Sequence, residues 1–183
     1  LDLVVFGRAT GMHIQQELKS GGGVDSSTRS DINKSLERLN TLNDSTSGYD
    51  PAEVKRELQE CMQNYFGVFR RGEFMKKGLD QLSEIKEKVD NLHLKDKSDA
   101  FNTSRVEAIE LQNLFEVAES TAVSAYIRNE SRGAHARDDY PDRDDENWLC
   151  HTICDPLTKE VTKRGVNFQP SKVEAFPPKV RTY

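Results

Sequence analysis

Apolar residues recur at helical spacing through most of the first 130 positions of the chain. They follow the i, i+3, i+4, i+7 spacing of an amphipathic helix, with polar residues on the opposite face. Over residues 73–93 the apolar repeat averages near 3.5 residues, which is typical of a seam between bundled helices. The pattern predicts five helices, over residues 1–20, 31–44, 51–70, 73–93 and 105–129.

Capping residues place several of the helix starts. We expect Ser30 to cap the second helix, and Asp50 to cap the third helix ahead of Pro51. The run Ser104–Glu107 has the form of a capping box and predicts the start of the fifth helix. We expect Val68 and Phe69 to lie on the inward face of the third helix. The predicted buried face of the fifth helix comprises Val106, Ile109, Leu114, Val117, Ala118, Thr121, Ala122 and Ala125.

The pattern changes after residue 130. Residues 148–153 and 159–168 have the composition of two strands, and Asp155 and Pro156 begin a turn between them. Residues 175–183 contain two adjacent prolines and predict an extended tail. We therefore expect a mainly α protein. The helices between residues 31 and 129 form an antiparallel bundle, with an extra N-terminal helix, a small C-terminal β-hairpin and an extended tail.

Composition narrows the class of protein. The 183 residues are 35% hydrophobic and 31% charged, which suits one helical domain with appendages. A net charge of −5 argues against a nucleic-acid partner, because nucleic-acid binding needs a basic face. The apolar run at residues 1–9 is too short to span a bilayer and has no signal-peptide features. Three cysteines without a secretory signal favour reduced thiols in a cytosolic compartment.

An acidic segment between Arg137 and Asn147 holds six acids and two arginines. Such a segment keeps one shape only if its charges find fixed partners; otherwise it is a solvated loop. We expect Arg132, His135 and Arg137 to hold it in place through hydrogen bonds to carboxylates or carbonyls. An alternative pairs His135 with neighbouring acids for acid–base chemistry. No nucleophile, phosphate loop or dinucleotide fingerprint accompanies it.

The run from Cys150 to Cys154, with His151 between them, raises the possibility of a zinc site. The spacing differs from the usual C-x2-C pair, and the candidates for a fourth ligand are His135 and Cys61. A strand would also point Cys150 and His151 to opposite faces. We therefore expect no metal, and the residues alone indicate no self-sufficient active site.

Four separated segments, residues 1–8, 130–138, 141–148 and 176–183, carry a family resemblance in the right order. They resemble the C-terminal third of the flavoprotein subunits of bacterial succinate dehydrogenases. Fumarate reductase flavoproteins and L-aspartate oxidases share the Ser-Arg-Gly-x-His element found at residues 131–135. The oxidases resemble the chain less after Trp148, and the fumarate reductases usually continue past the final prolines.

The resemblance implies a domain plan. Residues 1–23 would be the C-terminal helix of an upstream FAD-binding domain. Residues 24–130 would form a three-helix, spectrin-repeat-like domain. Residues 131–183, the acidic loop, hairpin and tail, would pack on the FAD-binding domain and near an iron–sulfur subunit. Membrane-anchor subunits would be indirect partners, and the complex would sit peripherally on the cytoplasmic face of the bacterial inner membrane.

The resemblance also implies what the chain lacks. The whole enzyme would oxidise succinate to fumarate with FAD and pass electrons through iron–sulfur clusters to quinone. Its flavin-binding and catalytic residues would lie upstream of Leu1, so we expect no catalytic residue, no FAD and no activity in these 183 residues alone. Leu1 would lie at the edge of the FAD site. Structural or interface roles are implied for Arg132, His135, Arg137, Trp148 and His151.

One alternative is kept beside this family assignment. The chain could be a stand-alone helical module for protein interaction, which requires the gene to begin near Leu1. Reading the upstream codons separates the two, since the enzyme hypothesis needs a glycine-rich flavin-binding sequence there.

Overall fold

The computed structural model describes residues 1–22, 26–171 and 174–179. The chain divides into two compact units, Leu1–Asn40 and Thr41–Tyr183. No helix among the described residues is both long enough and apolar enough to cross a membrane.

The first unit contains α1 (Asp2–Lys19) and most of α2 (Arg29–Asp44), so both predicted N-terminal helices are present. The cap of α2 differs from the prediction. The Thr28 hydroxyl accepts a hydrogen bond from the Asp31 amide at 3.2 Å, and the Thr28 amide donates to the Asp31 carboxylate at 3.0 Å. The reciprocal capping box needs an acid three residues after the cap, and Asp31 stands at that distance from Thr28. Ser30 therefore lies inside the helix.

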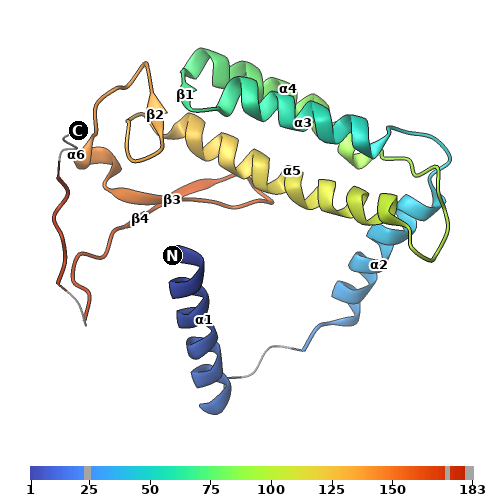
Figure 1. Ribbon diagram of the computed structural model, residues 1–183, viewed down its shortest axis with the longest axis horizontal. Coiled ribbons are helices and arrows are strands. Elements are labelled where there is room, and N and C mark those ends of the chain that lie inside the picture. Colours follow the sequence, from blue (N-terminus) through green and yellow to red (C-terminus); the bar gives the residue numbers. More distant parts are fainter. Residues whose placement is uncertain (23–25, 172–173, 180–183) are drawn as a thin grey trace. The chain divides into compact units, whose positions relative to one another are not determined.

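The second unit is built on α3 (Pro51–Phe66), α4 (Gly72–Asp90) and α5 (Thr103–Ile127), which lie side by side. Helices α3 and α5 run in the same direction and α4 runs against them (Figure 1). Asp50 caps α3 as predicted, because its carboxylate accepts from the Ala52 amide at 2.9 Å. The mainly α fold class and the three-helix bundle are confirmed.

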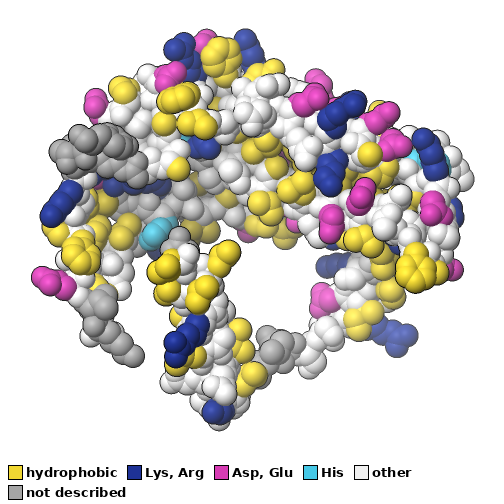
Figure 2. All heavy atoms as spheres, viewed as in Figure 1, with side chains coloured by type: hydrophobic (Ala, Val, Ile, Leu, Met, Phe, Trp, Pro, Cys, Tyr) yellow, Lys and Arg dark blue, Asp and Glu magenta, His cyan; other side chains and the backbone are white. Residues whose placement is uncertain are grey.

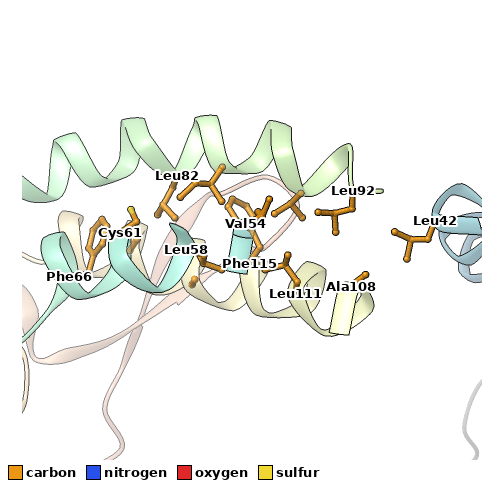
Figure 3. Close-up of a cluster of buried hydrophobic side chains, with 14 of the residues drawn as sticks. Leu42, Val54, Leu58, Cys61, Phe66, Leu82, Leu92, Ala108, Leu111 and Phe115 are labelled. Atoms are coloured by element: carbon orange, nitrogen blue, oxygen red, sulfur yellow. The ribbon is translucent and has the colours of Figure 1, made fainter. Parts of the chain in front are cut away.

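The bundle core is filled by large apolar side chains from all three helices (Figure 3). Helix α4 presents its predicted seam, since Met75, Leu82 and Ile85 are almost fully buried. Cys61 lies in the same core, where burial raises the pKa of its thiol to about 11. Gly78 permits the close approach of α3 and α4, because a Cβ there would lie 2.5 Å from side-chain atoms of Tyr65 and Phe66.

Helix α3 ends earlier than predicted. It stops at Phe66, and Gly67 takes an extended backbone conformation. Residues 69 and 70 form the short strand β1 (Phe69–Arg70), which pairs in parallel with β2 (Ala136–Arg137). Val68 and Phe69 are consequently 68% and 78% exposed rather than buried. The local apolar pattern continues the helix, but pairing with a segment far along the chain ends it.

Helix α5 buries a different face from the predicted one. Asn102 rather than Ser104 caps it, because its side chain accepts from the Arg105 amide at 2.9 Å. The larger apolar residues Leu111 and Phe115 fill the core, while Val106, Leu114 and Val117 remain exposed. Because α5 is apolar on two sides, helical spacing alone does not identify its core face. The prediction holds for its small residues Ala118, Ala122 and Ala125.

The C-terminal part adds a short helix and a hairpin. Helix α6 (Asp145–Trp148) precedes β3 (Cys150–Cys154), which pairs antiparallel with β4 (Val161–Gly165). The predicted strand start at Trp148 is wrong, because Asp144 caps a helical turn by accepting from the Glu146 and Asn147 amides. The hairpin lies beside the C-terminal half of α5 (Figure 1), where Lys159 forms an ion pair with Glu119 at 2.6 Å. Residues 174–179 form no helix or strand, and residues 180–183 of the predicted tail lie outside the described residues.

Candidate functional site

Charged side chains converge where α5 ends and the acidic segment begins. We call this region the arginine corner, and it comprises Arg70, Arg71 and residues 128–145. At its centre Glu130 is 0% exposed. Arg128 donates to Glu130 from Nη2 at 2.6 Å, and Arg132 donates from Nε at 2.8 Å and from Nη2 at 3.0 Å. The carboxylate also accepts from the Asp144 amide at 2.9 Å, so the residues before α6 are tied to the end of α5.

The surroundings of Glu130 favour its charged form. Burial by itself raises the pKa of Glu130, but hydrogen bonds from Arg132, the Asp144 amide and Arg128 outweigh burial and lower it. The hydrogen bond to Glu130 raises the pKa of Arg132. Arg132 continues the network to Asp145 at 2.6 Å, and Arg143 pairs with Asp145 at 3.0 Å.

Arg137 is the second anchor of the corner and is 3% exposed. Its Nη1 donates to the carbonyls of Tyr126 and Arg128, at 3.0 and 3.2 Å, and so satisfies acceptors at the C-terminal end of α5. Its Nε and Nη2 each donate to Asp139 at 2.7 Å. Asp139 in turn accepts from the Gly72 amide at the start of α4, at 2.8 Å. The bidentate pair therefore joins the ends of two helices.

His135 is half-buried between two arginines. Its Nε2 lies 3.1 Å from the Arg128 carbonyl, and its Nδ1 lies 2.7 Å from Arg70 Nη1. Since a guanidinium only donates, Nδ1 must accept and the ring is neutral with its proton on Nε2. Burial lowers the pKa of His135, and the charges of Arg70, Arg137 and Arg128 lower it further. The proposed acid–base neighbours have other partners, because Asp138 pairs with Arg71 and Asp139 with Arg137.

Trp148 connects the corner to the hairpin. It is 8% exposed, with the Arg128 guanidinium 5.5 Å from its ring and Lys163 Nζ 3.6 Å from it. Such cation–π contacts hold the ring between α5 and β4. His151 is exposed on the face of β3 opposite to that of Cys150 and Thr152, and it is paired with Arg164 in the hairpin register.

The sequence-predicted residues thus fall into three groups. Arg132, His135 and Arg137 meet within the arginine corner, and Trp148 lies against it. His151 lies outside this contact network. Leu1 belongs to the first unit, where its carbonyl accepts from the Val4 and Val5 amides at the start of α1.

Three features of the described residues bear on the chemistry available to them. All three cysteines are free thiols. Within residues 1–22, 26–171 and 174–179, no group of three or more His, Cys, Asp or Glu residues is placed to hold a metal ion. His135 contacts the Arg70 guanidinium and the Arg128 carbonyl, and no hydroxyl or thiol in the described part of the chain is hydrogen-bonded to it. The corner fixes loop geometry and presents guanidinium groups.

Sequence reasoning missed Glu130, Arg128 and Arg70 as members of the corner. The alternation of Arg128, Glu130 and Arg132 directly after a helix was an available signal, because opposite charges two residues apart share one side of an extended chain. Arg70 carried no comparable signal, since its contact with His135 joins residues 65 positions apart.

A three-helix bundle whose helix ends are joined by arginine–carboxylate pairs defines a mainly α helical domain. Residues 55–183 match the family described as the fumarate reductase flavoprotein C-term. The chain belongs to this family, and its relatives are flavoprotein subunits of succinate dehydrogenases and fumarate reductases.

Individual relatives agree over the whole chain. The succinate dehydrogenase flavoprotein subunit of Coxiella burnetii is 44% identical over 99% of this chain and 31% of its own length. The fumarate reductase flavoprotein subunit of Haemophilus influenzae is 32% identical over 100% of this chain and 30% of its own length. Among solved structures, E. coli quinol fumarate reductase is 32% identical with a TM-score of 0.80, over 99% of this chain and 31% of that chain. The chain therefore spans about 31% of the length of these relatives.

Proposed function

We propose that the chain is the C-terminal domain of a succinate dehydrogenase flavoprotein. The observation that carries the proposal is the 44% identity to the Coxiella burnetii flavoprotein subunit, extending over 99% of the chain. The whole protein would oxidise succinate to fumarate with FAD and pass electrons through an iron–sulfur subunit to quinone.

The domain plan follows from the proposal. Residues 1–23 belong to the end of the FAD-binding domain, and residues 24–130 form the helical C-terminal domain. Residues 131–183 pack on the FAD-binding domain, and Leu1 lies at the edge of its FAD site. The flavin chemistry is assigned to the upstream part of the longer protein, which would supply the glycine-rich turn that holds dinucleotides.

The contribution of this domain is positional. Glu130 and Arg137 are buried and hold the acidic segment in one conformation against the ends of α4 and α5. A loop fixed in this way offers a preformed surface to the flavin domain and to the iron–sulfur subunit. Arg132, His135, Arg137, Trp148 and His151 therefore have structural or interface roles. The complex would lie peripherally on the cytoplasmic face of the bacterial inner membrane, with the anchor subunits as indirect partners.

A fumarate reductase is the second candidate. The E. coli quinol fumarate reductase match, with a TM-score of 0.80, supports it. The two enzymes differ in the physiological direction of one redox reaction, and the domain described here would serve either.

The test uses two proteins, the 183-residue chain and the longer flavoprotein with its upstream sequence. We expect the longer protein to retain FAD and to reduce an artificial acceptor with succinate. We expect the 183 residues alone to be colourless and inactive. Turnover by the short chain would contradict the proposal, and so would an upstream sequence without a flavin-binding motif.

A further inference from the structure

Arg70 differs from the arginines around it, because no described residue gives it a carboxylate partner. Its Nε donates to the carbonyls of Phe66 and Gly67, at 3.2 and 3.0 Å, and its Nη1 contacts neutral His135. Among the described residues no carboxylate lies within ion-pairing distance of Arg70. Every other arginine of the corner has such a partner, namely Arg71, Arg128, Arg132, Arg137 and Arg143.

The position of Arg70 makes this missing partner significant. The side chain is half-buried, and both burial and the nearby charge of Arg137 lower its pKa. A partly desolvated cation without a counterion is unfavourable, so the site favours an anion that approaches from outside the described residues.

A groove opens beside Arg70. It has a volume of about 650 Å³ and runs between α5 and β3. Arg70, Arg128 and His135 contact one another at one end of it, and Val117, Cys154 and Pro156 form part of its apolar wall. The one acidic residue of its lining, Glu116, lies twelve residues before Arg128 on α5, about 18 Å away along the helix. One cationic end and an apolar wall suit a carboxylate that is carried on a largely apolar body.

The apolar surface continues beyond the groove. Val117 also lines a neighbouring hollow of about 370 Å³ with Leu114, and Leu114 and Val106 are 43% and 54% exposed. Apolar side chains accordingly reach the surface along α5 (Figure 2). From Val106 to Val117, which is 65% exposed, a helix rises about 16 Å, which is longer than a small organic acid and suits a polypeptide segment.

We propose that this groove receives an Asp or Glu side chain of a polypeptide segment of the longer flavoprotein outside these 183 residues, with Arg70 as its ion-pair partner. The inference rests on the proposed function, and the chain spans only 31% of its relatives' length, which leaves most of such a protein to supply the segment. Charge complementarity at Arg70 and the apolar face of α5 together select a protein segment that carries an acidic residue.

Cys154 makes the proposal testable, because its half-buried thiol lines the groove. The experiment measures alkylation of Cys154 by a maleimide in the longer flavoprotein, with peptide mass spectrometry to distinguish it from Cys61 and Cys150. Arg70→Met removes the charge, and Val117→Asp places a repelling carboxylate on the wall. The control for Arg70→Met is Arg71→Met, which breaks an ion pair outside the groove. The control for Val117→Asp is Val68→Asp, because Val68 is 68% exposed and Val117 is 65% exposed.

We expect the wild-type thiol to be protected. Alkylation should be about tenfold faster in Arg70→Met and in Val117→Asp, because either change opens the covered groove. The two controls should react as the wild type does. Circular dichroism and Trp148 emission verify that each variant folds. If Arg70→Met does not fold, Val117→Asp still tests the proposal.

Two outcomes would overturn the inference. One is a wild-type Cys154 that reacts as fast as it does in the denatured protein, since the groove would then be uncovered. The other is protection that survives both groove variants.

A third arm compares sodium acetate with sodium chloride at equal ionic strength on the 183-residue chain. If acetate stabilises the wild type but not Arg70→Met, while Cys154 of the longer protein is unprotected, the site serves a free carboxylate instead.

The same preparations separate this inference from the proposed function. A longer protein that oxidises succinate yet leaves Cys154 unprotected contradicts the groove alone. A longer protein that neither binds FAD nor oxidises succinate contradicts the proposed function.

Discussion

Arg137 and Asp139 form a bidentate pair that caps two helices at once. Arg137 satisfies carbonyls at the end of α5, and Asp139 accepts the Gly72 amide at the start of α4. Their two N–H···O bonds are both 2.7 Å long. A side-chain pair thus replaces two separate caps and fixes the angle at which α4, α5 and the acidic segment meet.

Arg137→Met should lower the free energy of unfolding by about 3 kcal/mol, because it leaves Asp139 and three backbone carbonyls without their buried partner. Arg71→Met is the matched control. Its ion pair with Asp138 is solvent-exposed, so that change should cost about 0.5 kcal/mol. Urea denaturation followed by circular dichroism measures both, and equal losses would contradict the special role of Arg137.

The pH dependence of stability should carry the signature of Asp139. The hydrogen bonds from Arg137 are the main reason that the pKa of Asp139 falls from 3.8 to about 2. A carboxyl with a lowered pKa in the folded state stabilises above its unfolded pKa, and this contribution is lost as pH falls from about 4 to about 2. Asp139→Asn should flatten the stability curve in this acidic range. Thermal unfolding at a series of pH values checks it, and an unchanged curve would refute it.

Glu130→Gln should destabilise the second unit by about 3 kcal/mol, because it leaves Arg128 and Arg132 partly buried without their shared carboxylate. Release of the Arg128 side chain should also shift Trp148 emission to longer wavelength. Glu146→Gln is the control, since Glu146 is exposed on α6 and takes no part in this network. A Glu130→Gln protein as stable as that control would show that the buried charge is dispensable.

His135 should make the arginine corner sensitive to mild acid. Burial and three neighbouring arginines place its pKa below the ordinary value of 6.5. The unfolded chain therefore takes up the proton first, so the stability that the neutral ring contributes is present above about pH 6.5 and declines below it. His135→Gln can keep one donor and one acceptor and should remove this decline between about pH 7 and pH 5. The exposed His151→Gln should leave the decline intact, and stability profiles of the two variants distinguish these outcomes.

Gly78→Ala should be destabilising although alanine favours helices. The new Cβ would lie 2.5 Å from the Tyr65 Cβ and 2.5 Å from a ring carbon of Phe66. Overpacking of this kind costs about 1–3 kcal/mol. Gly165→Ala meets no atom within 4 Å and serves as the comparison. Melting temperatures of the two variants test the prediction, which fails if Gly78→Ala melts at or above the wild type.

Local sequence signals located the helices well where one face alone is apolar. Helix α4 shows this, because Met75, Leu82, Ile85 and Val89 of its apolar seam are buried. They failed on α5, whose second apolar face led to Val106, Leu114 and Val117 being assigned to the core. The end of α3 was misjudged for a different reason, since Phe69 and Arg70 leave the helix to pair with residues 136 and 137.

The candidate site was only partly predictable. An acidic segment bordered by arginines indicated that Arg132 and Arg137 need fixed partners. The identity of those partners depends on contacts across the fold. Glu130 is the hub because the turn after α5 buries it, and Arg70 reaches His135 only through the pairing of β1 with β2.

The register of Arg70 with Arg137 has a kinetic consequence. These two residues lie 67 positions apart, and the whole of α4 and α5 forms the loop that their strands close. Closing so long a loop is slow compared with pairing adjacent helices. We therefore expect the helical bundle to assemble first and β1 to pair with β2 last. The Asp138 amide, which donates to the Arg70 carbonyl, should then exchange with solvent deuterium sooner than the amides inside α4.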